Sequence, residues 1–248
     1  MTVGGQERSY LVIEPASDGG PVPLMLALHP FGARSEEFAS LSQFAGLAES
    51  AGVLVVFPAG ISQSWNAGTC CGDAVIRGID DVAFIRSLIE SLASEYPVDP
   101  ERVFVTGFSN GGMMAYRLGC ELSDAITAVG VVGGALVTDC QPAQSVSLIV
   151  LHGTADDLLP FDGGEGFAGI HYRSVAETVD EWVAANACEA EPTSMQAQGS
   201  IRMVWSQCAA DGQVLFITAT EQGHVWFAPD PDASGEVWNF FDSLGGEG

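Results

Sequence analysis

The sequence predicts an α/β protein with a mostly parallel, doubly wound sheet and helices on both faces of that sheet. Short apolar segments alternate with helical patterns along all 248 residues, and this alternation is typical of strand–helix–strand units. Several apolar segments are continuous, as at residues 53–57, which indicates strands covered on both faces. Neither an internal repeat nor a linker interrupts the pattern, so we expect residues 1–248 to form one domain.

The strands are expected at residues 10–13, 23–29, 53–58, 103–106, 128–133, 147–152 and 214–220, and the helices at 36–50, 80–94, 110–122, 174–188 and 234–244. The clearest helix is 80–94, because its apolar residues recur at three- and four-residue spacing behind a capping Asp80 or Asp81. Two Gly-rich segments, 59–79 and 159–172, follow strand ends, where the loops of a parallel sheet form the ligand crevice. The segment after strand 128–133 is too short for a separate cap domain, so we expect an uncovered site.

The composition excludes several classes of protein. With 47% hydrophobic residues the chain can build a core and is not disordered, and no apolar run approaches the roughly 18 residues that span a bilayer. The 32 acidic and eight basic residues give a net charge of −24, and every basic residue is an arginine. Such a surface repels nucleic acid and anionic lipid, so we expect neither nucleic acid nor a membrane as a partner. The charge is interpreted as a source of solubility or an adaptation to salt.

The strongest chemical signal lies in residues 103–115. An apolar strand leads into Gly107, Phe108, Ser109, Asn110 and Gly111, which fit the pattern G-x-S-x-G, and a helical pattern follows. A sharp strand-to-helix turn crowds the residues two before and two after the serine, which explains the glycines. The turn lifts the hydroxyl clear of the sheet and directs backbone N–H groups at the reaction centre. Ser109 is therefore the expected nucleophile.

A serine hydroxyl needs a general base, and the base needs a carboxylate that orients it. In a strand–turn–helix site of this kind the acid and then the histidine follow the serine, at the ends of later strands. His224 follows strand 214–220 after a short turn and is the expected base. Strand 147–152 is followed by Asp156 and Asp157, and their chemistry alone does not separate the two carboxylates.

The oxyanion of the reaction needs two backbone donors, one after the nucleophile and one in the loop after an early strand. Asn110 supplies the first donor. In the loop after strand 23–29, Pro30 has no N–H group, which leaves Phe31 or Gly32, and we expect Phe31 to be the second donor.

Aromatic side chains are expected to form the wall of the pocket. Four aromatic residues lie on loops predicted near Ser109: Trp65, Phe31, Trp226 and Phe227. Of these, we expect Trp65 and Trp226 to contact substrate. The alternative is that these rings fill small apolar cores beneath the loops.

Six cysteines are more than an intracellular enzyme of this size usually carries. The sequence has no C-x-x-C motif, and its histidines are poorly placed to complete a cluster, so we expect disulfides rather than zinc. The cysteines favour a secreted or extracellular protein, although residues 1–5 have neither the basic start nor the apolar run of a signal peptide.

The expected topology restricts how the cysteines pair. Helix 174–188 ends and strand 214–220 begins at the same edge of the sheet, which predicts a bridge between Cys188 and Cys208. Cys140 follows a strand at the opposite edge, as do Cys70 and Cys71, so we expect Cys140 to pair with one of those two. The remaining cysteine, Cys120, lies far along the helix after the nucleophile and is expected to be a buried thiol.

The motifs in this order resemble those of the polyhydroxybutyrate depolymerase-like esterases, relatives of the feruloyl and acetyl xylan esterases within the α/β-hydrolase fold. The resemblance extends from about residue 8 to residue 243, and it is carried by segments 28–32, 65–66, 70–72, 80–84, 105–116, 152–156, 223–226 and 237–241. It implies that Asp156, rather than Asp157, is the acid. It also implies a serine carboxylesterase that forms an acyl-enzyme.

Two substrate classes follow from the resemblance: feruloyl- or acetyl-type esters of plant polysaccharide, and short-chain polyhydroxyalkanoate oligomers. The expected partner is therefore a small or polymeric ester, and no cofactor or metal ion is expected. Two other functions would use the same fold. An acyltransferase would pass the acyl group to an alcohol instead of water, and a non-catalytic binding protein would have no need of an intact serine, aspartate and histidine.

Overall fold

The computed structural model describes residues 1–16, 19–189, 191–197 and 199–244. In chain order its strands are β1 (Thr2–Val3), β2 (Gln6–Glu7), β3 (Tyr10–Ile13), β4 (Val22–Leu28), β5 (Leu54–Pro58), β6 (Val98–Phe108), β7 (Ala128–Val132), β8 (Ser147–Gly153), β9 (Gly164–Glu165), β10 (His171–Tyr172), β11 (Thr193–Ala197), β12 (Ser200–Trp205) and β13 (Val214–Ala219). Its α-helices are α1 (Ser35–Ser42), α2 (Leu47–Ser50), α3 (Gly72–Ile76), α4 (Asp81–Glu95), α5 (Asn110–Glu121), α6 (Val175–Ala185) and α7 (Ala233–Ser243).

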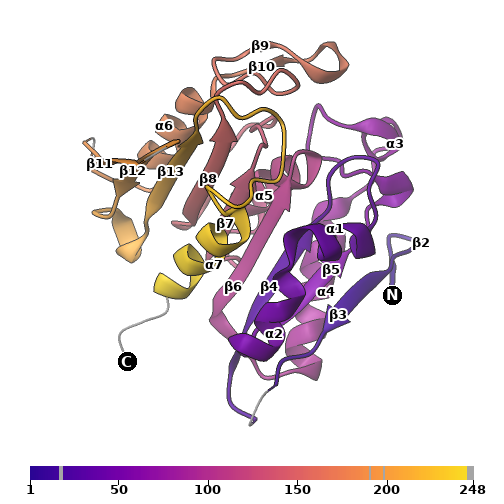
Figure 1. Ribbon diagram of the computed structural model, residues 1–248. Helices are drawn as coiled ribbons and strands as arrows, with labels where there is room; N and C mark the ends of the chain where they lie inside the picture. The colour runs from indigo at the N-terminus through magenta and orange to yellow at the C-terminus, as the bar shows by residue number, and fades with distance from the viewer. Residues whose placement is uncertain (17–18, 190, 198, 245–248) are drawn as a thin grey trace.

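One large sheet has the strand order β11-β12-β13-β8-β7-β6-β4-β5-β3 (Figure 1). Neighbouring strands from β13 to β5 are parallel. The strands outside them, β3 at one edge and β12 and β11 at the other, are antiparallel to their neighbours. The mostly parallel, doubly wound sheet expected from the sequence is therefore confirmed.

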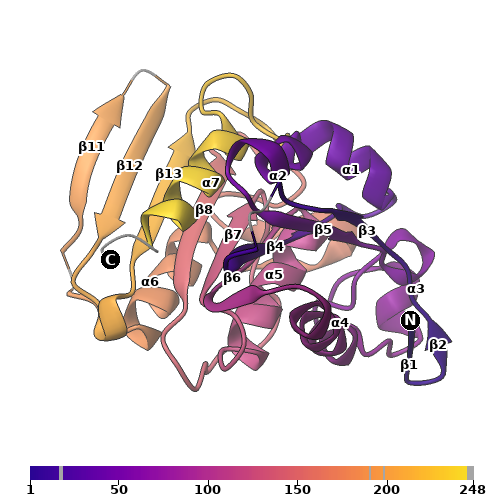
Figure 2. The ribbon, with the colours of Figure 1, turned by 90° about the horizontal axis from the view of Figure 1, so that it is seen from below.

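Helices cover both faces of this sheet (Figure 2). On one face α4, α5 and α6 pack onto the strands, with Phe84, Tyr116 and Trp182 among their buried side chains. On the other face α1 and α7 contribute Phe38 and Phe241 to a second apolar cluster. Because the central strands are buried on both sides, they need apolar residues at successive positions, which is why they appear as continuous apolar runs in the sequence.

Several elements differ from those predicted. The expected helix at 36–50 is interrupted, because Gln43 takes a left-handed φ of 57° and a 3-10 turn, Phe44–Gly46, separates α1 from α2. Strand β6 begins at Val98, five residues before the apolar run that predicted it. Strands β11 and β12 were not predicted, because every residue of β11 is exposed and the antiparallel edge leaves little apolar pattern in the sequence.

The two aspartates at the start of α4 have different roles. Asp80 is the N-cap and accepts a hydrogen bond of 2.9 Å from the third amide along the helix. Asp81 is buried and forms an ion pair of 2.6 Å with Arg8, whose guanidinium carbon lies 3.8 Å from the centre of the Phe84 ring. The second carboxylate oxygen of Asp81 accepts the amide of Asn66 at 2.8 Å. Asp81 thus ties the segment after β2 to the loop after β5.

The six cysteines form three disulfides, of which one was predicted correctly. Cys188 and Cys208 are joined, as expected. Cys140 pairs with Cys120 rather than with Cys70 or Cys71, so the expected second bridge and the expected buried thiol are both wrong.

The geometry of the β7–β8 connection explains the error. Since β7 and β8 are parallel, their connection has to return from the carboxyl edge of the sheet to the amino edge. Cys140 lies midway along that return, where its Cα atom is 5.2 Å from that of Cys120 in the last turn of α5. The cysteines left over, Cys70 and Cys71, are joined to each other.

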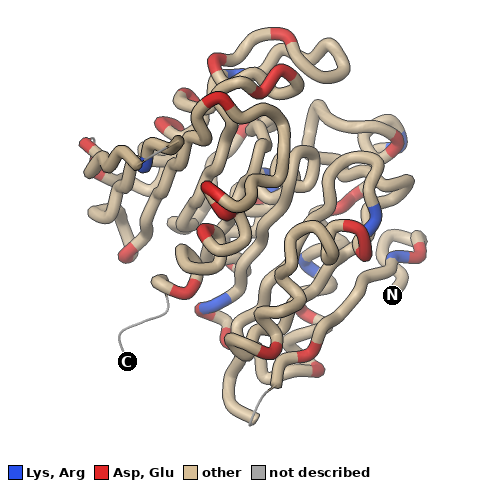
Figure 3. The backbone as a smooth tube through the Cα atoms, viewed as in Figure 1, with Lys and Arg blue, Asp and Glu red and all other residues tan. Residues whose placement is uncertain are grey.

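Acidic residues are spread along the chain on all sides of the molecule seen in Figure 3, whereas basic residues occur at a few points. Six of the eight arginines form ion pairs with carboxylates. The surface therefore offers little positive potential to a phosphate or a carboxylate. Among the helices described, none combines the length and the apolar character that a membrane span requires.

Candidate active site

Ser109 lies at the turn between β6 and α5. Its φ of 55° and ψ of −120° are a combination that residues with side chains rarely adopt. The Ser109 amide donates to the carbonyl of Val132 at 3.0 Å, and the Ser109 carbonyl accepts the amide of Met113 at 2.8 Å. The strained turn is thus held from the neighbouring strand β7 and from the first turn of α5.

Two glycines of the turn are required by close backbone contacts. A Cβ atom on Gly107 would lie 2.4 Å from the carbonyl of Gly111, and a Cβ atom on Gly111 would lie 2.1 Å from the carbonyl oxygen of Leu28. Only glycine therefore allows the first turn of α5 to pack this closely on β6 and on the end of β4. These contacts give the physical reason for the G-x-S-x-G pattern.

A continuous chain of hydrogen bonds joins Ser109, His224 and Asp156. The Ser109 hydroxyl donates to Nε2 of His224 at 2.8 Å, and Nδ1 of His224 donates to Oδ2 of Asp156 at 2.7 Å. The three residues follow β6, β13 and β8, whose carboxyl ends meet at one edge of the sheet. The imidazole ring lies against Phe108, with ring centres 5.0 Å apart. The structure thus brings together the residues that the sequence suggests as nucleophile, base and acid.

Asp156 is buried among hydrogen-bond donors. Its Oδ1 accepts the amides of Leu158 and Leu159 at 3.0 and 2.8 Å, and its Oδ2 lies 3.3 Å from Nε2 of His152 in addition to the bond from His224. Burial alone would raise the pKa of Asp156, but the hydrogen bonds from His152, His224 and Leu159 outweigh it and hold that pKa well below its usual range. The carboxylate is therefore ionised at neutral pH, as the orientation of a base requires.

His152 is a neighbour of the acid that sequence reasoning did not identify. Its ring is buried, and its Nε2 lies 2.9 Å from the carbonyl of Leu159 as well as 3.3 Å from Asp156. Because both neighbours are acceptors, Nε2 carries the proton and His152 is a second imidazole donor to the acid. Asp157, the alternative acid, is exposed instead. The available signal was the position of His152 at the end of β8, four residues before Asp156.

Two backbone amides near Ser109 are available to an anion. Phe31 and Asn110 both line the cavity at Ser109. The amide of Gly32 donates to the carbonyl of Gln63 at 2.8 Å, whereas the amide of Phe31 has no hydrogen-bond partner within the described part of the chain. Asn110 is the first residue of α5, where N–H groups lack partners inside the helix. The structure therefore favours Phe31 over Gly32 as the donor from this loop.

A cavity of about 270 Å³ opens at Ser109, and its wall is largely apolar. Besides Ser109, Asn110 and His224, it is lined by Pro30, Phe31, Cys71, Phe108, Met113, Leu158, Leu159 and Phe167. The rings of Phe31 and Phe167 lie 5.8 Å apart, and both side chains are partly exposed. The two Gly-rich loops expected to border the site each contribute, through Cys71 and Phe167.

Most of this wall was not identified from the sequence. Phe108 and Met113 flank the nucleophile, and Leu158 and Leu159 follow the acid, so closeness to those residues in the chain is the signal that could have found them. Phe167 has no such signal, because it comes from the middle of a loop whose path the sequence does not determine.

The structure does not place Trp65 and Trp226, the expected substrate contacts, in the wall of the cavity at Ser109. Trp65 is completely buried, and its indole N–H points inward to a backbone carbonyl at 3.0 Å. Trp226 is 9% exposed, packs edge-on against Phe38, Phe44 and Phe108, and donates its indole N–H to a serine hydroxyl at 3.1 Å. Both rings fill the cores beneath their loops.

The chain is similar to one protein family and to two known proteins. A model of the family described as phospholipase/carboxylesterase matches residues 79–203. Feruloyl esterase B of Piromyces equi is 31% identical over 88% of this chain and 42% of its own length, so the chain spans less than half of that protein. A putative esterase, NocK, of Nocardia uniformis subsp. tsuyamanensis is 31% identical over 91% of this chain and 72% of its own length.

A solved structure gives an independent comparison of the fold. The acetyl xylan esterase from Aspergillus awamori superposes with a TM-score of 0.69 over 94% of this chain and 93% of its own, at 18% sequence identity. At that identity the similarity shows a shared fold.

Proposed function

Because the chain belongs to the phospholipase/carboxylesterase family and has the α/β-hydrolase fold, we propose that it is a serine carboxylic-ester hydrolase with Ser109, His224 and Asp156 as its catalytic residues. The observation that carries the proposal is the hydrogen-bond chain through these three residues, at 2.8 and 2.7 Å, beside an apolar cavity. Residues 1–248 would act as one catalytic domain on a small or polymeric ester.

The mechanism follows from the positions of the protons. Nδ1 of His224 carries a proton toward Asp156, so Nε2 is free to take the hydroxyl proton as Ser109 attacks the ester carbonyl. The amides of Phe31 and Asn110 stabilise the oxyanion. His224 then returns the proton to the departing alcohol, which leaves an acyl-enzyme. A water molecule attacks this acyl-enzyme by the same proton transfer and releases the acid.

The cavity favours apolar acyl groups of modest size. Its volume of about 270 Å³ lies just below the range of about 300–1,000 Å³ that is typical of sites for drug-sized ligands. A cavity of this size would accommodate an acyl unit, with the alcohol outside it. The Phe31 and Phe167 rings suit an aromatic acid such as ferulic acid, in keeping with the feruloyl esterases among the relatives. A hydroxybutyrate unit of a polyester is the competing acyl group.

The three disulfides support a location in an oxidising compartment. We infer that the protein works outside the reducing cytosol. Reduction of the purified protein should then lower its stability at unchanged pH, and alkylation of the native protein without reductant should modify no thiol.

Hydrolysis of a panel of esters tests the proposal. The panel is p-nitrophenyl acetate and butyrate, methyl ferulate, acetylated xylan and a hydroxybutyrate oligomer, with Ser109→Ala beside the wild type. Asp156→Asn should lower kcat by about 10⁴-fold. Asp157→Asn is the matched control, since it removes the adjacent, exposed carboxylate, and it should leave kcat unchanged.

The outcomes separate the competing functions. Highest kcat/KM on methyl ferulate supports the aromatic acyl group, and highest kcat/KM on the oligomer supports the polyester. Ester products formed from an added alcohol acceptor would indicate acyl transfer. The esterase function would be refuted if no ester were hydrolysed and Ser109 of the folded protein did not react with a fluorophosphonate probe. That result would favour a non-catalytic binding protein.

A further inference from the structure

Trp65 is bonded to both segments that carry the backbone donors near Ser109. Its indole N–H donates to the carbonyl of His29 at 3.0 Å, two residues before Phe31. Its backbone N–H donates to Oδ1 of Asn110 at 2.8 Å, and Nδ2 of Asn110 donates to the Trp65 carbonyl at 3.1 Å. All of these groups are buried. The side chain and the backbone of Trp65 thus connect the loop after β4 to the first residue of α5.

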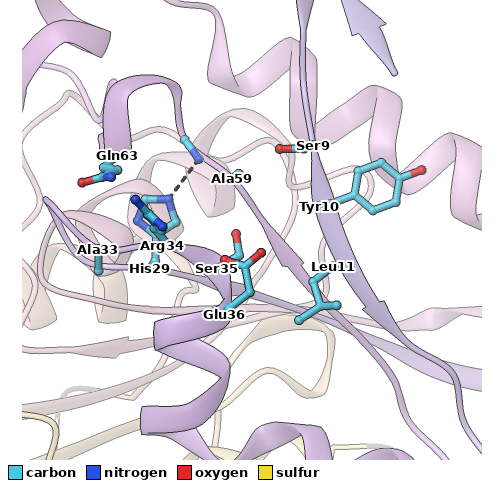
Figure 4. Close-up of a pocket in the computed structure, with 11 residues that line it drawn as sticks. Ser9, Tyr10, Leu11, His29, Ala33, Arg34, Ser35, Glu36, Ala59 and Gln63 are labelled. Carbon is cyan, nitrogen blue, oxygen red and sulfur yellow. Dashed lines mark hydrogen bonds between the residues drawn. The ribbon is translucent and has the colours of Figure 1, made fainter.

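The loop that carries Phe31 is also bonded, through His29, to the loop after β5. Nε2 of His29 accepts the amide of Gly60 at 3.0 Å, the dashed line in Figure 4. Nδ1 therefore carries the proton and donates to the carbonyl of Pro30 at 2.9 Å. Burial lowers the pKa of His29, which keeps Nε2 unprotonated and able to accept. The His29 ring also lies 5.0 Å from the Trp65 ring.

A second cavity, of about 230 Å³, lies next to this contact. Figure 4 shows His29, Arg34 and Gln63 among the residues that line it. The carbonyl of Gln63 accepts the amide of Gly32. Both ends of the short loop from His29 to Gly32 are therefore bonded to the segment that contains Gln63 and Trp65. The Phe31 amide between them is left available to a ligand.

We propose that Trp65 is a positioning residue that sets the relative placement of the Phe31 and Asn110 amides, so that the oxyanion hole is formed before substrate binds. This proposal rests on the esterase function proposed above. Trp65 does not line the cavity, so its loss should leave ground-state binding nearly unchanged. The two amides act on the charge that develops in the transition state, so the effect should fall on kcat rather than on KM.

The fall in kcat for a Trp65 variant should be no larger than that caused by removing a whole oxyanion donor. Removal of one oxyanion donor lowers kcat by about 100- to 1,000-fold, and displacement of a catalytic group by about 1 Å can lower it about 100-fold. Loss of the indole N–H loosens one donor segment without removing its amide. We therefore expect kcat to fall by about 10- to 100-fold.

Trp65→Phe removes the indole N–H and keeps an aromatic ring, and Trp182→Phe is a matched control. Trp182 is 1% exposed, and its indole N–H also donates to a backbone carbonyl, that of Val146, at 2.8 Å. Trp182 lies on α6 and does not line the cavity. Both variants lose a buried hydrogen bond from an indole N–H. The Val146 carbonyl keeps a bond of 2.8 Å from Nδ2 of Asn186, so Trp182→Phe should cost less stability than Trp65→Phe, for which we expect about 1–3 kcal/mol.

The expected result is a fall in kcat for Trp65→Phe alone, with KM changed by less than about threefold. The inhibition constant of phenylboronic acid should rise by a similar factor to the fall in kcat, because its tetrahedral adduct with serine places an oxygen at the two amides. A Trp65→Phe variant with the kcat and the boronate affinity of Trp182→Phe would overturn the proposal.

A second variant covers the case in which Trp65→Phe does not fold. Asn110→Ala removes both bonds to the Trp65 backbone and keeps the Asn110 amide, so it should show the same fall in kcat and in boronate affinity. Unchanged kcat in that variant would also overturn the proposal. An inactive wild type with unreactive Ser109 would instead refute the esterase function itself, so the two failures are distinguishable.

Discussion

Replacement of Asp81 by leucine should destabilise the protein by about 3–5 kcal/mol, because it leaves the Arg8 guanidinium buried without its carboxylate. The side chains of Arg8 and Asp81 are 2% and 0% exposed and lie 2.6 Å apart, so solvent does not screen the pair as it screens surface ion pairs. Burial raises the pKa of Asp81 and lowers the pKa of Arg8, and each residue opposes the shift of the other. Each charge is therefore stable in this position only with its partner.

The double variant Arg8→Met/Asp81→Leu should be more stable than Asp81→Leu alone, because apolar side chains replace both charges next to the Phe84 ring. The Asn66 amide still loses its acceptor, which costs about 1–3 kcal/mol. Urea unfolding followed by tryptophan fluorescence gives the free energies of unfolding for Arg8→Met, Asp81→Leu and the double variant. At about 2–4 °C per kcal/mol, a loss of about 3–5 kcal/mol lowers Tm by about 6–20 °C. A loss below about 1 kcal/mol for Asp81→Leu, or additive losses in the double variant, would refute the reasoning.

Three further predictions concern acid stability, specificity and the disulfides. The pKa of Asp156 lies below its unfolded value of about 3.9, so its contribution to stability is complete above that pH and is lost as pH falls further. Wild-type urea midpoints should therefore fall more steeply below about pH 4 than those of Asp156→Asn, and parallel curves would contradict this. Phe167→Ala removes the ring opposite Phe31 and should lower kcat/KM for methyl ferulate by about 2- to 12-fold. Hydrolysis of p-nitrophenyl acetate by that variant is the control and should be unchanged. Replacing both Cys188 and Cys208 by alanine opens a loop with a sequence separation of 20, which should cost about 3 kcal/mol in urea unfolding, and a loss near zero would contradict the expectation.

The parallel core of the sheet could be predicted from the sequence because its strands are buried on both faces. Burial on both sides requires consecutive apolar residues, and residues 53–57 and 147–152 display that requirement directly. Of the antiparallel edge strands, β3 was predicted, whereas β11 and β12 could not be predicted in the same way. Every residue of β11 is exposed, so nothing in its apolar pattern distinguishes it from a loop.

The candidate nucleophile and base could be identified because each is fixed by local chemistry at a strand end. Local chemistry narrowed the acid only to Asp156 or Asp157, and the family resemblance favoured Asp156. Gly107 and Gly111 are needed by contacts that are local to the turn and the strand below it. The roles of Trp65 and Cys140 depend on how long connections pass other elements, and no local pattern records such a path. The sequence shows that an aromatic ring lies on a loop near the site, but the same composition suits a substrate contact and a buried anchor.

The loop after β5 contributes both to stability and to the proposed placement of the oxyanion donors, and separate bonds serve the two roles. Asp81 binds the amide of Asn66, and Nη1 of Arg117 on α5 donates to the Asn66 carbonyl at 2.7 Å. Trp65 is joined to Asn110 by two further hydrogen bonds that do not involve Asp81. Removing both charges of the Arg8–Asp81 pair therefore leaves Trp65 attached to α5 and to the loop that carries Phe31. The double variant should keep the wild-type kcat, whereas Trp65→Phe should lower kcat, because positioning depends on the bonds of Trp65 and not on the total stability of the loop.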